Sequence, residues 1–134
     1  MAQAEGLTLP FEGEEALRVN LLECFPYEGK KQHIVYETSE FSAVCPFSGL
    51  PDYGHFKMTY IPNKHIVELK SLKYYLTSYR NVGIYQEHAT NKLYTDLEAL
   101  LEPEYLEITL VYNTRGGIDT TTSINSKSQT PVNA

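Results

Sequence analysis

A cysteine and an aspartate stand seven positions apart in the stretch SAVCPFSGLPDYG, residues 42–54. A proline follows Cys45 directly, and Gly49 and Pro51 also disfavour helix and regular strand, so a loop is expected here. Functional side chains are often presented from loops, and a cysteine thiolate is an effective nucleophile. A carboxyl group at Asp52 could exchange protons with an adduct. The local pattern leaves two interpretations open: this chemistry, or a small buried thiol beside an aspartate that stabilises its own turn.

The second cysteine, Cys24, lies in the sequence ECFPY and has no acidic partner in its own loop. A packing role is therefore expected for it. Two cysteines are too few for a disulfide scaffold. The four histidines and Cys45 do not show the compact spacing of zinc ligands, so no metal is expected.

Two cations, Lys70 and Lys73, stand three residues apart in VELKSLKYY, residues 67–75. Residues at this spacing share one face of a helix, and a helix N-terminus favours anions. The pair would therefore suit a phosphate, although a solvated basic face is the alternative. Glu87 is open to two interpretations in the same way. It could favour the dipole of a helix that starts nearby, or accept two N–H bonds from a purine-like edge.

The pattern of apolar residues predicts the order β-β-α-α-β-β. A stripe at helical spacing marks a long helix over residues 85–103. The other expected elements are strands at 33–43, 55–61, 105–113 and 118–124, a short strand or a strand-to-helix junction at 65–69, and a helix at 71–79. Turn-forming residues end the segment 21–29, and a turn is expected at residues 115–117. Consecutive helices between strand hairpins indicate an α+β fold, an antiparallel sheet with both helices on one face. The edges of so small a sheet need pairing, which favours an oligomer.

The chain of 134 residues is expected to form one domain over residues 21–124. Residues 1–20 are expected to be a flexible or loosely docked arm and residues 125–134 a disordered tail. No apolar run is long enough to cross a membrane, and the first 20 residues do not resemble a secretory signal, so a cytoplasmic location is expected. The net charge of −6 argues against stable nucleic-acid binding.

Three segments occur together in an order that resembles one enzyme family: CPFSGLPD, VELKSLKYY and YQEHATN, with RNVG before the last and RGGI after it. They resemble the NADPH-dependent 7-cyano-7-deazaguanine reductases of queuosine biosynthesis, in their unimodular form. The family pattern E-[SL]-K-[SA]-x-K-[LY]-[YFW] is met in full by residues 68–75. The resemblance covers about residues 20–120.

This resemblance implies a tunnelling fold, in which ββααββ subunits close jointly into barrels. It implies a homo-oligomer, typically a decamer of two pentamers, with active sites between subunits and a small deazapurine substrate. It also implies that NADPH reduces the nitrile of 7-cyano-7-deazaguanine to an aminomethyl group. Cys45 would be the nucleophile that forms a thioimide, and Asp52 would be the proton donor.

Further residues receive roles from the same resemblance. Lys70 and Lys73 would bind NADPH, and the deazaguanine ring would be held by Val67, Glu68, Leu69, Gln86 and Glu87. The family commonly has histidine at position 86. Glutamine forms hydrogen bonds but does not carry a proton at neutral pH. Gln86 is therefore expected to be a hydrogen-bonding substitute, and His88 a residue of the helix stripe without a catalytic role.

Three alternatives are weighed against the reductase. An amidinotransferase relative that makes archaeosine would keep the cysteine chemistry but lack the intact NADPH motif. A cyclohydrolase relative would need a metal-ligand set that the sequence does not offer. A non-catalytic purine- or pterin-binding barrel would consume no nicotinamide.

Overall fold

The computed structural model describes residues 2–129, so residues 1 and 130–134 lie outside the described part of the chain. The strands are β1 (Cys24–Pro26), β2 (Ile34–Val44), β3 (Pro51–Ile61), β4 (His65–Val67), β5 (Tyr105–Arg115) and β6 (Ile118–Asn125). The helices are α1 (Leu69–Thr77) and α2 (Gln86–Leu101), and three short 3-10 helices cover Glu14–Ala16, Val19–Leu21 and Ser126–Gln129.

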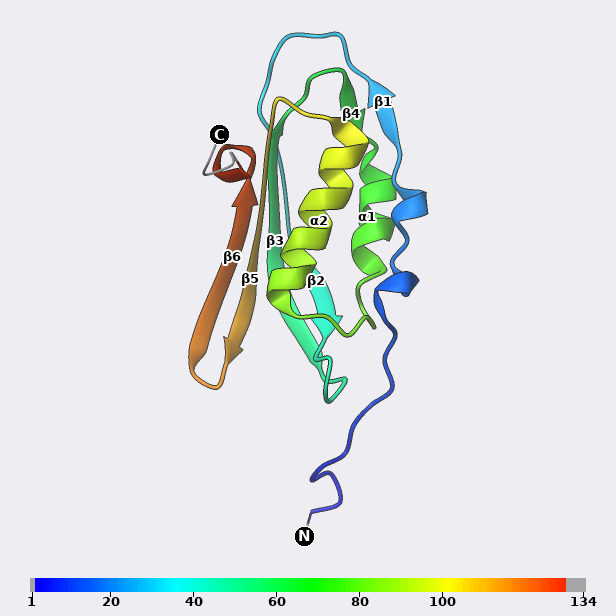
Figure 1. The fold of residues 1–134 in the computed structure, drawn as a ribbon, viewed down its shortest axis with the longest axis vertical. Coiled ribbons are helices and arrows are strands. Elements are labelled where there is room, and N and C mark those ends of the chain that lie inside the picture. Colours follow the sequence, from blue (N-terminus) through cyan, green and yellow to red (C-terminus); the bar gives the residue numbers. More distant parts are fainter. Residues whose placement is uncertain (1, 130–134) are drawn as a thin grey trace.

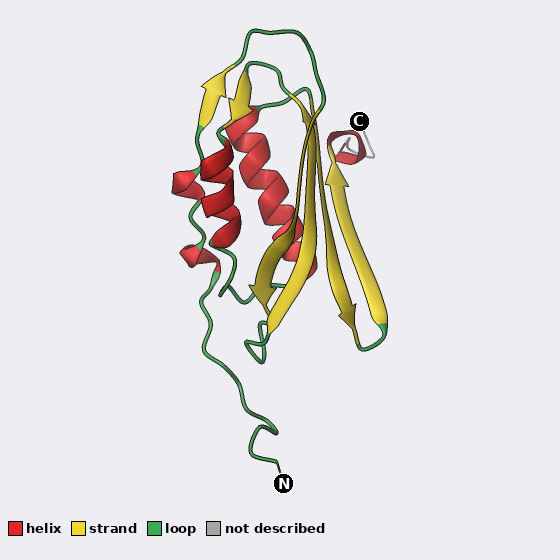
Figure 2. Ribbon diagram, turned by 180° about the vertical axis from the view of Figure 1, so that it is seen from behind, coloured by secondary structure: helices red, strands yellow, loops and turns green. Residues whose placement is uncertain are grey.

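Four strands form one antiparallel sheet in the order β2-β3-β5-β6, and both α-helices cover the same face of it (Figure 2). Side chains alternate along each strand, so every second residue of β3, such as Phe56, Met58 and Tyr60, is buried under the helices. The predicted α+β layer and its order are confirmed. The other face of the sheet carries no helix.

Helix α2 packs on the sheet through one stripe. Ala89, Leu93, Leu97 and Leu101 recur at helical spacing and are fully buried. The helix ends at Glu102, which adopts a left-handed conformation immediately before a proline. Helix α1 is shorter and contributes Leu72 and Tyr75 to the same core.

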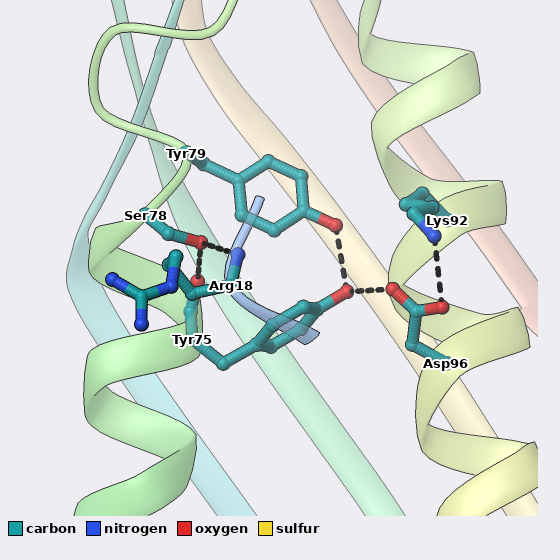
Figure 3. A network of polar contacts seen from close by, with 6 residues as sticks. All are labelled: Arg18, Tyr75, Ser78, Tyr79, Lys92 and Asp96. Atoms are coloured by element: carbon teal, nitrogen blue, oxygen red, sulfur yellow. Dashed lines mark hydrogen bonds and ion pairs between the residues drawn. The ribbon is translucent and has the colours of Figure 1, made fainter. Parts of the chain in front are cut away.

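Hydrogen bonds between polar side chains connect the two helices inside this core (Figure 3). The hydroxyl of Tyr75 lies 2.6 Å from Asp96 Oδ2 and 2.8 Å from the hydroxyl of Tyr79. Asp96 also accepts from Lys92 Nζ at 3.0 Å. The ring of Tyr75 is fully buried, and burial raises its pKa, so the hydroxyl stays protonated and donates to Asp96.

Two local features differ from the sequence prediction. A small second sheet pairs β1 with β4, although the sequence indicated no strand at residues 24–26. Strand β3 begins at Pro51 rather than at residue 55, so Asp52 lies on a strand. Proline is tolerated as the first residue of a strand, where its missing N–H does not interrupt the ladder.

Residues at both ends of the described chain dock on the domain. Leu17 is buried, and the backbone of Glu12 exchanges hydrogen bonds with the segment at 81–83. At the other end, Asn125 is the last residue of β6 and Ser126 donates and accepts bonds with the backbone of β5. Part of each segment that the sequence assigned to an arm or a tail thus packs on the domain. Among residues 2–129, no helix is long and apolar enough to cross a membrane.

The connections of the sheet gather at two opposite ends (Figure 1). One end holds the β2–β3 turn, the β5–β6 turn and the start of α2. The other end holds β1, β4 and the start of α1. This division decides which of the predicted site residues can meet within one chain.

Candidate active site

The cysteine loop is a tight turn between β2 and β3. The backbone N–H of Cys45 donates a hydrogen bond to Leu50 O at 2.8 Å, and the N–H of Gly49 donates one to Cys45 O at 2.9 Å. Gly49 has a φ of 75°, and a Cβ there would lie 2.3 Å from Leu9 O, so only glycine fits. The N-terminal arm closes over this turn, because the N–H of Leu9 donates to Ser48 O at 2.7 Å.

The environment of Cys45 favours the thiolate. The side-chain hydroxyl of Ser48 lowers the pKa of Cys45 most, followed by the backbone N–H groups of Ser48 and Phe47. Slight burial and the charge of Asp52 act in the opposite direction without reversing the shift. The thiol is only half-buried and unpaired, so it is both ionisable and accessible.

Asp52 lies at the start of β3, beside the cysteine loop. It pairs in register with Ala43 of β2. The even-numbered residues of β3, such as Gly54, face the helices, so the side chain of Asp52 lies on the same helix-covered face. The side chain of Asp52 is 15% exposed. The structure thus brings Cys45 and Asp52 to the same end of the molecule, close enough for the charge of one to act on the other.

Gln86 is the first residue of α2 and is almost fully buried. Its amide nitrogen donates to two backbone carbonyls, Leu110 O at 3.1 Å and Thr120 O at 3.0 Å. Its amide oxygen accepts from Arg115 Nη2 at 3.0 Å. Gln86 therefore connects the start of α2 to β5 and β6, and its contact with the deazaguanine ring stays a prediction.

Arg115 is a residue of this end that the sequence placed only in a turn. Its Nη1 lies 3.6 Å from Asp52 Oδ1, and its guanidinium lies 4.8 Å from the ring centre of Tyr112. A β-bulge between Tyr112 and Arg115 adds one residue to β5, and this reverses the alternation of side chains. Arg115 consequently shares the helix-covered face with Tyr112.

Aromatic side chains border the cysteine loop on the side of α2. The rings of Phe47 and Tyr85 meet edge to face with centres 6.0 Å apart, and His88 packs on Tyr85 at 5.7 Å. His88 is exposed on the surface of α2. Glu87, in the first turn of α2, is also exposed at this end.

The remaining predicted site residues lie at the opposite end. Val67 ends β4 and is buried, and Glu68 caps α1 by accepting bonds from the N–H groups of Lys70 and Ser71. Leu69 and Lys70 begin the helix, and both are exposed. Within one chain, this group does not meet Cys45 and Asp52 (Figure 1).

A cavity of about 680 Å³ lies between α1 and the edge strand β2. Leu72, Lys73 and Leu76 of α1 line it together with Val35 and Glu37 of β2. Lys70 stands one turn before Lys73 on the same helix. The lining is mixed, because Glu37 and Glu40 face the cavity as well as Lys73 and the apolar side chains, and Cys45 does not line it.

Cys24 packs partly buried against the core and is not joined to Cys45. Its expected packing role agrees with this position. Within residues 2–129, no group of three His, Cys, Asp or Glu side chains is arranged to hold a metal ion.

Comparisons with known proteins identify relatives of the whole chain. Residues 51–131 match the family described as QueF-like protein. NADPH-dependent 7-cyano-7-deazaguanine reductases of Thermotoga petrophila and Thermotoga maritima are each 54% identical over 127 residues, which covers 94% of this chain and 93% of theirs. The enzyme of the same name from Caldicellulosiruptor bescii is 53% identical over 110 residues, covering 81% of this chain and 84% of its own.

The fold has a counterpart among solved structures. The crystal structure of the archaeosine synthase QueF-Like in the apo form superposes with a TM-score of 0.64 over 75% of this chain and 96% of that one. The two sequences are 21% identical, so this likeness concerns the fold alone.

Proposed function

The chain belongs to the QueF-like protein family, and from this premise we propose that it is an NADPH-dependent 7-cyano-7-deazaguanine reductase of queuosine biosynthesis. Its reaction converts the nitrile of 7-cyano-7-deazaguanine into the aminomethyl group of 7-aminomethyl-7-deazaguanine. The observation that carries the proposal is the accessible Cys45 thiol, whose pKa is lowered by the loop around it and whose neighbour is Asp52.

Cys45 would begin the reaction by covalent catalysis. A nitrile carbon resists direct reduction, whereas addition of the Cys45 sulfur converts it into a thioimide with a reducible C=N bond. The S–C bond forms as one C–N π bond opens, and the nitrogen takes up a proton. NADPH, when bound, supplies the hydrides for two successive reductions, and the thiolate is released between them.

Asp52 would supply the protons to the substrate nitrogen. It lies beside the cysteine loop on a rigid strand, so its carboxyl group has a fixed position relative to the sulfur. Glu87 stands at the same end and would accept N–H bonds from the pyrimidine edge of the deazaguanine ring.

The second group of residues would complete the site from another subunit. Lys70 and Lys73 fit NADPH because both are exposed on one helix, and Lys73 lines the cavity beside it. Val67, Glu68 and Leu69, which precede them, would contact the ring. We propose that the open edges of β2 and β6 pair between subunits to close barrels, in a decamer of two pentamers in the cytoplasm.

The proposal is tested by following the nicotinamide absorbance of the purified chain with 7-cyano-7-deazaguanine and NADPH. Two NADPH are expected to be consumed per nitrile. Cys45→Ala should abolish turnover, while Cys24→Ala, which changes the packing cysteine, should keep it. When 7-cyano-7-deazaguanine is added without NADPH, a covalent adduct with the mass of the substrate should form on Cys45. Comparable turnover by Cys45→Ala would refute the mechanism.

The NADPH assay also distinguishes the reductase from the non-catalytic barrel and the amidinotransferase. A non-catalytic barrel would bind the ring and consume no NADPH. An amidinotransferase would act on the nitrile without oxidising nicotinamide. The reductase name of the relatives at 54% identity disfavours both, since the likeness to the archaeosine synthase reaches only the fold.

A further inference from the structure

Arg115 joins three side chains at the end of the molecule that holds Cys45. Its Nη2 donates to Gln86 Oε1 at 3.0 Å, its Nη1 lies 3.6 Å from Asp52 Oδ1, and its guanidinium lies over the ring of Tyr112. The two nitrogens thus reach different elements, the start of α2 and the start of β3. A guanidinium group suits such a bridge, because it is planar and its N–H donors point in fixed directions relative to one another.

The backbone is shaped to aim Arg115 at this position. The bulge in β5 moves Arg115 from the open face of the sheet to the helix-covered face. Gly54 of β3 leaves room for the ring of Tyr112, because a Cβ at Gly54 would lie 2.6 Å from that ring. The guanidinium of Arg115 lies 4.8 Å from the centre of the Tyr112 ring, so the ring acts as a platform for it.

Gln86 is suited to hold Arg115 in a way that histidine is not. Its amide group donates two hydrogen bonds to carbonyls and still accepts one from the guanidinium. A neutral imidazole has one donor and one acceptor, and a protonated imidazole has no acceptor. Glutamine at position 86 and arginine at position 115 therefore form one unit in this chain.

We propose that Arg115 is a positioning residue, which holds the Asp52 carboxylate beside the cysteine loop and is itself held by Gln86. This inference rests on the proposed function, since it assigns Arg115 a part in the step that Asp52 performs. Arg115 acts through Asp52 and need not touch the substrate. Its side chain is 44% exposed, so its replacement should leave the fold intact.

A double-mutant cycle of Arg115→Ala and Asp52→Asn tests this inference through nitrile reduction. Asp52→Asn should lower kcat by about 100-fold or more, as is usual for loss of a proton donor. Arg115→Ala should lower kcat by about 10-fold or more, because the carboxyl group is misplaced. The double variant should be no slower than Asp52→Asn, and the KM for NADPH should stay within about twofold of the wild type.

Two further variants sharpen the cycle. Arg115→Lys should recover little activity, since a single ammonium group cannot bridge Gln86 and Asp52 as a fork does. Arg18→Ala removes an exposed arginine that bonds Asn20 instead, and it should leave kcat unchanged. Multiplied losses in the double variant, or a loss confined to the KM for NADPH, would overturn the proposal.

A second readout does not depend on turnover. The rate at which iodoacetamide alkylates Cys45 as a function of pH, followed by peptide mass mapping, gives the pKa of the thiol. Asp52 opposes ionisation of Cys45, so Arg115→Ala should raise this pKa, Asp52→Asn should lower it, and the double variant should match Asp52→Asn. If Arg115→Ala raised the pKa of Cys45 equally in the wild type and in the Asp52→Asn variant, the coupling between Arg115 and Asp52 would be refuted. Coupling without nitrile reduction in the wild type would refute the proposed function alone.

Discussion

The pKa of Cys45 is lowered by the turn that follows it rather than by a neighbouring cation. The Ser48 hydroxyl is the largest cause of its lowered pKa, and two backbone N–H groups add to the effect. Such donors stabilise the thiolate more than the thiol, because they bond the charged sulfur. The order Cys-Pro-Phe-Ser-Gly is therefore a small anion-stabilising turn.

Ser48→Ala is expected to raise the pKa of Cys45, because the substitution removes the strongest donor. At neutral pH a higher pKa means a smaller thiolate fraction, so alkylation of Cys45 should slow. The difference should vanish at a pH well above both pKa values. The measurement is the alkylation rate of Cys45 against pH, with Ser39→Ala as a control in which an exposed serine of β2 bonds His55 instead. An unchanged pKa in Ser48→Ala would show that the backbone donors suffice.

The individual residues differed in how far the sequence revealed them. Cys45 and Asp52 could be proposed as candidates from their spacing in one loop, but the local pattern left their roles open, and the structure adds that both lie at the same end of the molecule. Arg115 could not, because its position depends on the one-residue bulge in β5 and on contacts with α2 and β3. A bulge leaves little trace in the alternation of so short a polar segment. The RGG triplet indicated the turn but not the direction of the arginine.

At the scale of elements, helix α1 is held against α2 by the hydrogen bonds of Tyr75. The hydroxyl of Tyr75 donates to the carboxylate of Asp96, which is 9% exposed, and contacts the hydroxyl of Tyr79. Bonds to a charged group are among the stronger ones in proteins. They fix the register between the helix that carries Lys70 and Lys73 and the helix that begins at Gln86.

Tyr75→Phe is expected to lower the free energy of unfolding by about 2 kcal/mol, because the carboxylate of Asp96 loses a buried donor. The neighbouring change, Tyr74→Phe, alters an exposed ring and should cost less than about 0.5 kcal/mol. Urea unfolding followed by circular dichroism measures both values. Equal stability of the two variants would mean that the buried hydroxyl contributes nothing.

Elements with a long apolar stripe could be predicted closely, and α2 is the example, since it occupies residues 86–101 within the expected 85–103. Short elements could not. Strand β1 spans only Cys24–Pro26 and exists because β4 pairs with it, a contact between residues about forty positions apart. Local propensity carries no information about such a partner. The early start of β3 has the same origin, because its first residues pair with β2.

At the scale of the whole molecule, the predicted site residues divide into two groups. Cys45, Asp52 and Glu87 lie at one end, whereas Glu68 and Lys70 lie at the other (Figure 1). Sequence order does not reveal this division, because it depends on the opposite directions of α1 and α2. Among residues 2–129 the outer edges of β2 and β6 pair with no further strand, so they are suited to pair with other copies of the chain. An active site shared between subunits accounts for both observations.

A shared site predicts that two inactive variants restore each other. Cys45→Ala and Glu68→Ala chains should each be inactive as pure proteins, and circular dichroism should show that Glu68→Ala, which loses a helix cap, is folded. When the two are unfolded, mixed equally and refolded together, about one quarter of the contacts should join an intact Cys45 to an intact Glu68 of a neighbour. Nitrile reduction should return to about that fraction of the wild-type rate.

The matched control mixes Cys45→Ala with Asp52→Asn chains. Both changes lie at the same end of the molecule, so every contact between their subunits lacks one of the two residues and no activity should return. A site contained in one chain would leave both mixtures inactive, since neither parent carries a complete set. If activity returns only in the mixture of Cys45→Ala and Glu68→Ala chains, the end that holds Cys45 must meet the end that holds Glu68 of another subunit. If both mixtures stay inactive, the shared site is refuted.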